Sequence, residues 1–302
     1  MTNKVVILGS TNVDQFLTVE RYAKPGETLH VKEGQKKYGG GKGANQAIAT
    51  ARMNADTTFI SKVGKDGLAD FMFDGFKEAG MNTEYITESE TADTGQAFIT
   101  VDKDGSNTIY VYGGANMDIT PEDVEQAEAV IKAADYVVAQ LEVPVPAIIR
   151  AFEIAREHNV TTILNPAPAS ELPESLLKLI DVIIPNEFEA EILSGIPVKD
   201  ENSMAQNADY FLNLGIKVVL ITIGAQGTYY AVKGNSGLVK AYKVDVVDTT
   251  AAGDTFIGAF VSAFDMKQMN LEKAIDFANK AASYTVQKSG AQISIPFAKD
   301  IK

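Results

Sequence analysis

Residues 247–256 read VDTTAAGDTF and lead into a helical pattern of small residues at Ile257–Ala263. Small residues before a helix let the backbone approach a ligand closely, and the first turn offers unpaired N–H groups to an anion. A carboxylate beside bound phosphate needs a role that outweighs the repulsion, and Asp254 could accept the proton of an attacking hydroxyl. Asp254 also suits a first helical turn or an N-cap. This segment alone leaves both interpretations open.

Outside this segment, short β-branched runs alternate with longer amphipathic stretches through most of the chain. This alternation predicts an α/β fold with a central, mostly parallel sheet flanked by helices. The predicted core strands are Lys4–Gly9, Thr57–Val63, Tyr136–Gln140, Thr161–Leu164, Val182–Ile184 and Lys217–Ile223. Helical patterns occupy Val145–Glu157 and Met204–Leu214.

Two regions break the alternation. They are Phe16–Lys37, with a turn signal at Lys24-Pro25-Gly26, and Gly95–Val101 followed by Thr108–Tyr112, with a turn signal at Asp104-Gly105. Their alternating polarity predicts a small projecting sheet, built from about residues 14–38 and 93–113, within one domain of residues 1–302. Such a sheet would be a lid over the carboxyl ends of the parallel strands, where open α/β sheets bind ligands. The alternative is a pair of surface hairpins without function.

The composition narrows the classes of function. The chain has 302 residues, a net charge of −13 and no cysteine, which excludes disulfides, thiolate metal sites and a cysteine nucleophile. The acidity argues against a nucleic-acid partner, because binding a phosphate backbone draws on clustered lysine and arginine. The longest apolar runs fall short of the roughly 18 residues of a membrane span, and the first strand-like segment begins at Lys4. We therefore expect a cytoplasmic protein that has no membrane partner.

Two glycine-containing segments in the first 50 residues are candidate ligand-binding segments. GSTNVD at Gly9–Asp14 follows the first strand, so Asn12 and Asp14 could pair with a polyol; a turn folded onto its own backbone is the alternative. GGGKGANQA at Gly39–Ala47 precedes a helical pattern at Gln46–Met53 and lacks the Walker A spacing. Its Lys42 and Asn45 could present donors to sugar hydroxyls or phosphate oxygens.

Two further segments follow predicted strands in the second half. PNEFE at Pro185–Glu189 places an amide and a carboxylate three residues apart, within reach of hydrated Mg²⁺ on ATP phosphates, although a helix start explains it as well. TIGAQG at Thr222–Gly227 suits a nucleotide phosphate or a plain turn. The two histidines, His30 and His158, are isolated from any triad or metal-ligand spacing and receive no catalytic role.

Together and in this order, these segments resemble the PfkB, or ribokinase, family of sugar kinases over essentially the whole chain, and within it the members that act on ribose. The resemblance rests on DTTAAGDTF at Asp248–Phe256, GGGKGANQA at Gly39–Ala47, GSTNVD at Gly9–Asp14, PNEFE at Pro185–Glu189 and KSGAQISIP at Lys288–Pro296. It implies transfer of the γ-phosphoryl group of ATP to the primary hydroxyl of ribose.

The resemblance also implies residue roles. Asp254 would be the catalytic base, and Ala251, Ala252 and Gly253 would form the anion hole for the transferring phosphoryl group. The sugar would be held by Asn12, Asp14, Gly41, Lys42, Asn45 and Glu142, together with Asp254. ATP would be held by Asn186, Thr222, Gly224, Gly227, Gly253 and Asn279.

The implied ions and partners follow the same resemblance. Glu189 would associate with Mg²⁺ through water. An activating monovalent cation, usually K⁺, would be bound mostly by backbone carbonyls of Asp248, Thr250, Thr285, Lys288, Gly290 and Ser294. The projecting sheet would serve as the lid and as the interface of a homodimer.

Three alternatives remain at this point. A kinase of the same family for deoxyribose, a nucleoside or another sugar would keep the fold and the base, although Asp14, Lys42 and Asn45 together favour ribose. A sugar-sensing protein without catalysis would have no need of Asp254 beside a phosphate site. A nicotinamide-dependent oxidoreductase would carry G-x-G-x-x-G after the first strand, which Gly9–Asn12 does not supply.

Overall fold

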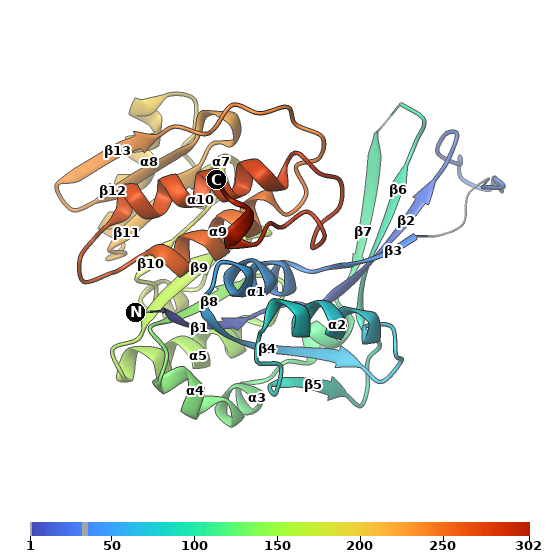
Figure 1. The fold of residues 1–302 in the computed structure, drawn as a ribbon, viewed down its shortest axis with the longest axis horizontal. Helices are drawn as coiled ribbons and strands as arrows, with labels where there is room; N and C mark the ends of the chain where they lie inside the picture. The colour runs from blue at the N-terminus through green and yellow to red at the C-terminus, as the bar shows by residue number, and fades with distance from the viewer. Residues whose placement is uncertain (1, 32–35, 105) are drawn as a thin grey trace.

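The computed structural model describes residues 2–31, 36–104 and 106–302, and within them most strands belong to one large sheet (Figure 1). Its neighbouring strands are parallel, except at the antiparallel pairs β11–β12 and β12–β13. In spatial order the strands are β13 (Asn235–Val239), β12 (Thr228–Val232), β11 (Val218–Thr222), β10 (Val182–Ile183), β9 (Thr161–Asn165), β8 (Tyr136–Gln140), β1 (Lys4–Leu8), β4 (Asp56–Gly64) and β5 (Ile86–Ser89). The predicted α/β class is confirmed.

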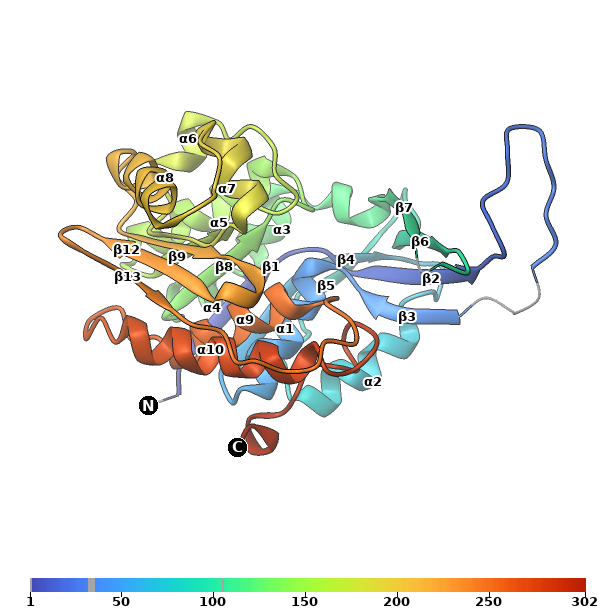
Figure 2. The ribbon, with the colours of Figure 1, turned by 90° about the horizontal axis from the view of Figure 1, so that it is seen from above.

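Helices cover both faces of this sheet, as Figure 2 shows. One face packs against α1 (Lys42–Arg52), α2 (Asp70–Ala79), α9 (Ala252–Ala263) and α10 (Leu271–Thr285). The other packs against α3 (Pro121–Gln126), α4 (Glu128–Lys132), α5 (Val145–Glu157), α6 (Glu174–Leu177), α7 (Glu187–Ser194) and α8 (Glu201–Asn213). Short 3₁₀ turns lie at η1 (Gly114–Asp118), η2 (Gly224–Gln226) and η3 (Ala298–Asp300).

Strand β1 shows why the sequence builds this layered core. Its alternate residues enter opposite cores, with Val5 and Ile7 in one hydrophobic cluster and Val6 and Leu8 in the other. A strand buried on both faces is therefore apolar throughout, which is why these runs are continuous rather than alternating. None of the helices in the described residues is both long and apolar enough to cross a membrane.

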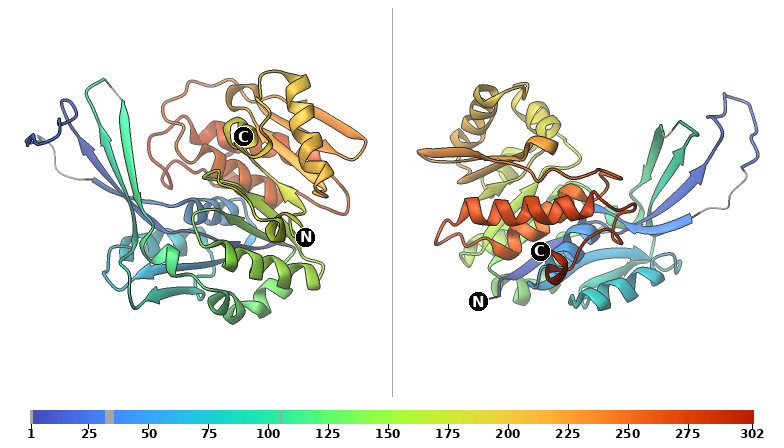
Figure 3. Two further views of the ribbon diagram at one scale, coloured as in Figure 1. Left: turned by 180° about the vertical axis from the view of Figure 1, so that it is seen from behind. Right: turned by 45° about the horizontal axis from the view of Figure 1, so that its top comes forward.

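A second, smaller sheet projects from one side of the molecule (Figures 1 and 3). Its order is β3 (Lys36–Gly40), β2 (Asn12–Thr18), β6 (Gly95–Val101) and β7 (Asn107–Tyr112), with β2 and β6 parallel. The predicted turn at Lys24-Pro25-Gly26 forms, since Glu27 N donates to Lys24 O at 2.9 Å. Residues 32–35 of the predicted strand region and Gly105 of the second predicted turn lie outside the described residues.

Several predicted boundaries differ from the structure. Asn12 and Asp14 lie inside strand β2, so the alternative of a self-bonded turn is wrong. Helix α1 begins at Lys42 rather than Gln46, because the glycines that suggested a loop are part of strand β3 and of the first helical turn. Helix α8 begins before Met204, at Glu201, because Asp200 caps it in a capping box with Ser203. The β12–β13 hairpin and strand β5 were not predicted.

The start of α1 packs directly on the end of β1. A Cβ on Gly9 would lie 2.6 Å from the Gly43 Cα, and a Cβ on Gly43 would overlap the backbone of Gly9 and Ser10. Ala44 N donates to Ser10 O at 2.8 Å, and Gly41 has a φ of 87°, which favours glycine. This backbone contact places the first turns of α1 at the carboxyl edge of the large sheet.

Candidate active site

A cavity of about 210 Å³ lies at the carboxyl edge of the parallel strands. It is reached from the ends of β9 and β11, the start of α7 and the first turns of α1 and α9. The structure brings seven predicted site residues to it, namely Lys42, Asn186, Glu189, Thr222, Ala251, Gly253 and Asp254. Segments distant in sequence therefore converge where an open α/β sheet binds its ligand.

Helix α9 begins at this cavity. Its N-cap, Ala251, has a left-handed backbone with φ 60°. Gly253 is exposed, and a Cβ there would meet no atom within 4 Å. The first turn of a helix carries N–H groups without intrahelical partners, so this open turn is suited to an anion.

The carboxylate of Asp254 is held by two side-chain amides. Asn45 Nδ2 donates to its Oδ2 and Gln46 Nε2 to its Oδ1, each at 3.0 Å. Only 9% of Asp254 is exposed. The sequence analysis identified Asn45 but missed Gln46, although it is the next residue of the same segment. It also missed Asn165, which ends β9 at the cavity.

Lys42 lies among three carboxylates. Burial lowers the pKa of Lys42. The negative charges of Asp254, Glu142 and Glu189 together raise it by more, so the net shift is upward. Burial raises the pKa of Glu189, while the backbone hydrogen bond from Asn186 and the charge of Lys42 oppose that rise. The lysine is therefore a firmly charged ammonium in an acidic environment.

Two of the predicted sugar residues, Asn12 and Asp14, lie on strand β2 of the projecting sheet. Asp14 lies over Gly40 of the neighbouring strand, where a Cβ would overlap its carboxylate. Burial and the charges of Glu142 and Asp254 raise the pKa of Asp14 to about 7. Glu142 accepts hydrogen bonds from Ser10 Oγ and, at 3.0 Å, from Lys42 N.

Asn12 is held by a residue that the sequence analysis missed. Its Oδ1 accepts from Asn116 Nδ2 at 2.7 Å, and Asn116 Oδ1 accepts from Thr11 N at 2.8 Å. Asn116 belongs to the short η1 turn, which carried no motif signal. Asn116 reaches Thr11 and Asn12 only through the tertiary fold, so the local sequence does not indicate this contact.

The predicted nucleotide residues divide into two groups. Asn186 and Glu189 form a capping box at the start of α7. Asn186 also forms an isolated parallel β-bridge with Thr222 through the backbone. Gly224 is exposed with a φ of 46°. Gly227 and Asn279 are not among the residues that line the cavity; Asn279 Nδ2 donates to Val239 O at 3.1 Å. A Cβ on Gly227 would overlap that same carbonyl oxygen.

The residues predicted to bind K⁺ lie on the segment before α9 and on the end of α10 with the segment after it, and hydrogen bonds join the two. Asp248 Oδ1 accepts from Thr250 N at 2.9 Å, and its Oδ2 accepts from Gly290 N at 2.9 Å. Lys288 N donates to Thr285 O at 3.1 Å. Burial raises the pKa of Asp248, but the hydrogen bonds from Gly290 and Thr250 to its carboxylate lower the pKa by more, so the net shift is downward.

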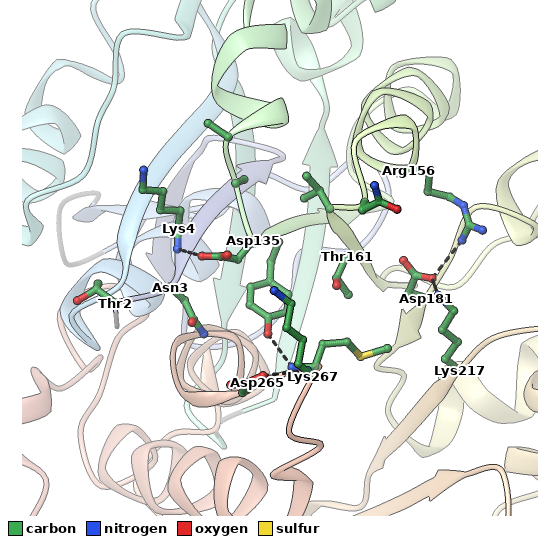
Figure 4. Close-up of a pocket in the computed structure, with 16 residues that line it drawn as sticks. Thr2, Asn3, Lys4, Asp135, Arg156, Thr161, Asp181, Lys217, Asp265 and Lys267 are labelled. Carbon is green, nitrogen blue, oxygen red and sulfur yellow. Dashed lines mark hydrogen bonds and ion pairs between the residues drawn. The ribbon is translucent and has the colours of Figure 1, made fainter.

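The largest cavity described, of about 860 Å³, lies at the opposite, amino edge of the sheet (Figure 4). Its buried carboxylate, Asp181, pairs with Arg156 at 3.1 Å and with Lys217 at 2.8 Å. None of the predicted site residues lines it. Over the residues described, no three His, Cys, Asp or Glu side chains are grouped so as to hold a metal ion.

The chain is similar to known carbohydrate kinases over nearly its whole length. The profile of the pfkB family of carbohydrate kinases matches residues 2–298. The ribokinase of Staphylococcus aureus (strain COL) is 68% identical, over 100% of this chain and 99% of its own. The deoxyribokinase of Salmonella typhimurium is 35% identical, over 97% of this chain and 95% of its own.

Among solved structures, that of Arabidopsis thaliana ribokinase complexed with ribose and ATP superposes with a TM-score of 0.92. It is 32% identical, and the match covers 100% of this chain and 98% of that one. The family expected from the sequence motifs is confirmed. The chain belongs to the pfkB family of carbohydrate kinases.

Proposed function

We propose that the chain phosphorylates D-ribose in the cytoplasm, transferring the γ-phosphoryl group of ATP to the primary (5-) hydroxyl with Asp254 as catalytic base. The observation that carries the proposal is the placement of the Asp254 carboxylate beside Lys42 and the open first turn of α9. In the described structure, Asn45 Oδ1 is buried without a hydrogen-bond partner. A sugar hydroxyl would supply the missing donor.

In the proposed step, the primary hydroxyl oxygen attacks the γ-phosphorus while its proton passes to Asp254. The bond from the γ-phosphorus to the bridging oxygen of ADP breaks, and ADP leaves with that electron pair. The protein chiefly aligns these groups and neutralises the spreading negative charge. Lys42 and the N–H group of Gly253 in the first turn of α9 would supply that neutralisation. The N–H group of Ala252 already donates to Thr249 O at 3.2 Å.

Mg²⁺ fits this site as an ion carried by ATP. Both carboxylate oxygens of Glu189 already accept hydrogen bonds from Asn186, at 2.9 and 3.0 Å. Glu189 would therefore hold the ion through water, as its place at the cavity allows. When bound, the ion would neutralise phosphate charge.

A monovalent cation such as K⁺ is also part of the proposal. The three hydrogen bonds that the Asp248 carboxylate accepts, from Thr250 N, Thr250 Oγ1 and Gly290 N, occupy both of its oxygens. Coordination would therefore fall mostly to backbone carbonyls, with Asp248, Thr250, Thr285, Lys288, Gly290 and Ser294 as the proposed ligands. The ion would stiffen the loop that leads into α9.

The choice of ribose rests on the similarity to ribokinases, and the deoxyribokinase similarity makes deoxyribose the second candidate. We expect the highest kcat/KM for ribose when ADP release is measured with MgATP and KCl against ribose, 2-deoxyribose, fructose and a nucleoside. Replacing KCl by tetramethylammonium chloride should slow turnover. A different preferred sugar would change the substrate and keep the mechanism. No turnover with any of them would favour a sugar sensor.

Asp254→Asn should lower kcat by about 10²- to 10⁴-fold, the usual contribution of a positioned general base. Because the amide keeps the shape of the side chain, calorimetric binding of ribose and of ATP should change little. Turnover close to that of the unsubstituted protein would remove Asp254 from the role of base.

Sugar affinity should depend on the ionisation of Asp14. Since its pKa is about 7 in the sugar-free protein, the carboxylate acceptor is present above this pH and is lost as the pH falls through it. We expect KM for ribose to rise below pH 7, by at most about tenfold per pH unit. In Asp14→Asn the KM should be higher and independent of pH between 6 and 8. A pH-independent KM in the unsubstituted protein would contradict this assignment.

We further propose that the projecting sheet is the lid of the site and the interface of a homodimer. Its edge strand β7 exposes Ile109, Tyr110 and Val111, and exposed apolar edge strands favour association. Sedimentation equilibrium should give a dimer, and Tyr110→Asp should shift it to monomer. Phe188→Asp is the matched control, because Phe188 on α7 is 69% exposed and Tyr110 is 67% exposed. A monomer at the outset would reject the interface.

A further inference from the structure

Two glutamines lie behind the cavity and have no role in the mechanism so far. Gln46 follows Asn45 in helix α1, and Gln140 is the last residue of β8. Both are fully buried, with 0% exposed. Buried amides carry a desolvation penalty unless they are hydrogen-bonded, so their partners show what they stabilise.

The hydrogen bonds fix the orientation of Gln46. Gln140 Nε2 donates to Gln46 Oε1 at 2.7 Å, so the amide oxygen of Gln46 faces β8 and its NH₂ group faces away. That NH₂ group donates to Asp254 Oδ1 at 3.0 Å and to Asn165 Oδ1 at 3.1 Å. Both of its hydrogens are therefore used.

The orientation of Asn165 is fixed in the same way. Its Nδ2 donates to Ile184 O at 2.9 Å, so its Oδ1 must face Gln46. The network therefore has one direction of donation, which runs from Gln140 through Gln46 to the carboxylate of Asp254. Reversing the amide of Gln46 would place its oxygen against the carboxylate of Asp254 and its NH₂ group against that of Gln140.

A purely structural role does not account for this network. In the described structure Gln140 Oε1 has no hydrogen-bond partner, and apolar residues of similar volume would fill the space without an unsatisfied atom. Gly9 also keeps the space open, because a Cβ there would overlap Gln140 Oε1. This arrangement fixes the direction in which the side-chain amide of Gln46 donates its N–H to Asp254.

We propose that Gln46, oriented by Gln140, is a positioning residue for Asp254. With Asn45 on Oδ2 and Gln46 on Oδ1, the carboxylate has one donor on each oxygen. Rotation about its final side-chain bond would break both hydrogen bonds. The carboxylate is therefore held in one plane, with its remaining lone pairs available to the substrate hydroxyl. This inference rests on the proposed role of Asp254 as base.

The test is steady-state kinetics with ribose and MgATP. Gln46→Met keeps the approximate volume and removes the amide, and should lower kcat about 10- to 100-fold because a catalytic group misplaced by about 1 Å loses this much. KM for both substrates should stay within about threefold, since the change acts on the chemical step. Gln140→Met should give a smaller loss in kcat, because Gln46 keeps its amide and loses only its orientation.

The control is Thr50→Val on the same buried helix. Thr50 Oγ1 donates to the backbone oxygen of Gln46 at 2.7 Å and has 0% exposure. This variant removes a buried hydrogen bond on α1 without changing the side-chain amide of Gln46, so kcat should stay near that of the unsubstituted protein. A loss as large as that of Gln46→Met would attribute the effect to helix α1 and overturn the proposal.

A double variant separates this inference from the proposed function. In the Asp254→Asn background, Gln46→Met should change the residual rate by less than about twofold, because no base remains to be positioned. An undiminished effect there would overturn the positioning role. Near-normal turnover of Asp254→Asn alone would reject the base itself.

The inference fails on its own if Asp254→Asn is inactive and Gln46→Met has normal kcat. If Gln46→Met does not fold by circular dichroism, Gln140→Met decides, and a kcat equal to that of the unsubstituted protein overturns the proposal.

Discussion

The backbone contact between Gly9 at the end of β1 and Gly43 in the first turn of α1 is the constraint on which the site depends. Neither position accepts a side chain, and Gly41 reaches the helix only through a left-handed backbone. Because α1 starts at that contact, its first two turns carry Lys42, Asn45 and Gln46 to the edge of the sheet. Helix α9 then packs along α1 so closely that a Cβ on Gly258 would lie 2.6 Å from Thr50 N. This packing sets Asp254 against the two amides.

The same convergence creates an electrostatic imbalance. Four carboxylates, those of Asp14, Glu142, Glu189 and Asp254, interact with the ammonium of Lys42 or with one another. The pKa of Asp14 rises to about 7 and that of Glu189 also rises, in both cases with burial as the largest cause. Sugar hydroxyls would offset part of this imbalance by donating to the carboxylates, and Mg²⁺ would cancel part of the negative charge that ATP brings. An acidic protein would thus bind the nucleotide more readily as its magnesium complex.

Local pattern was sufficient to predict the parallel core. Strand β8 and helix α5 have the predicted bounds, because continuous apolar runs and helical periodicity come from residues adjacent in sequence. The motifs likewise predicted most of the residues that line the cavity. Gln46 and Gln140 were not predicted because a buried glutamine carries no periodic signal, and its importance depends on which side chain lies opposite. Gly227 lay in a glycine-containing segment and Asn279 was implied by the family resemblance. In the structure Asn279 donates to Val239 O, and Gly227 packs against the same carbonyl oxygen.

The projecting sheet is anchored at its base by Asn12, which is proposed to bind the sugar, and by its neighbour Thr11. Thr11 N and Asn12 Oδ1 both bond to Asn116, and Thr11 Oγ1 lies 2.9 Å from Ser61 Oγ on β4. If the sheet closes as the proposed lid, it would bend beyond this anchored end, because moving the base would break buried hydrogen bonds. Asn12 and Asp14 would keep their places while the far end of β6 and β7 moved farthest. In this proposal the sugar contacts would form before closure, and the closing movement would then add the cover.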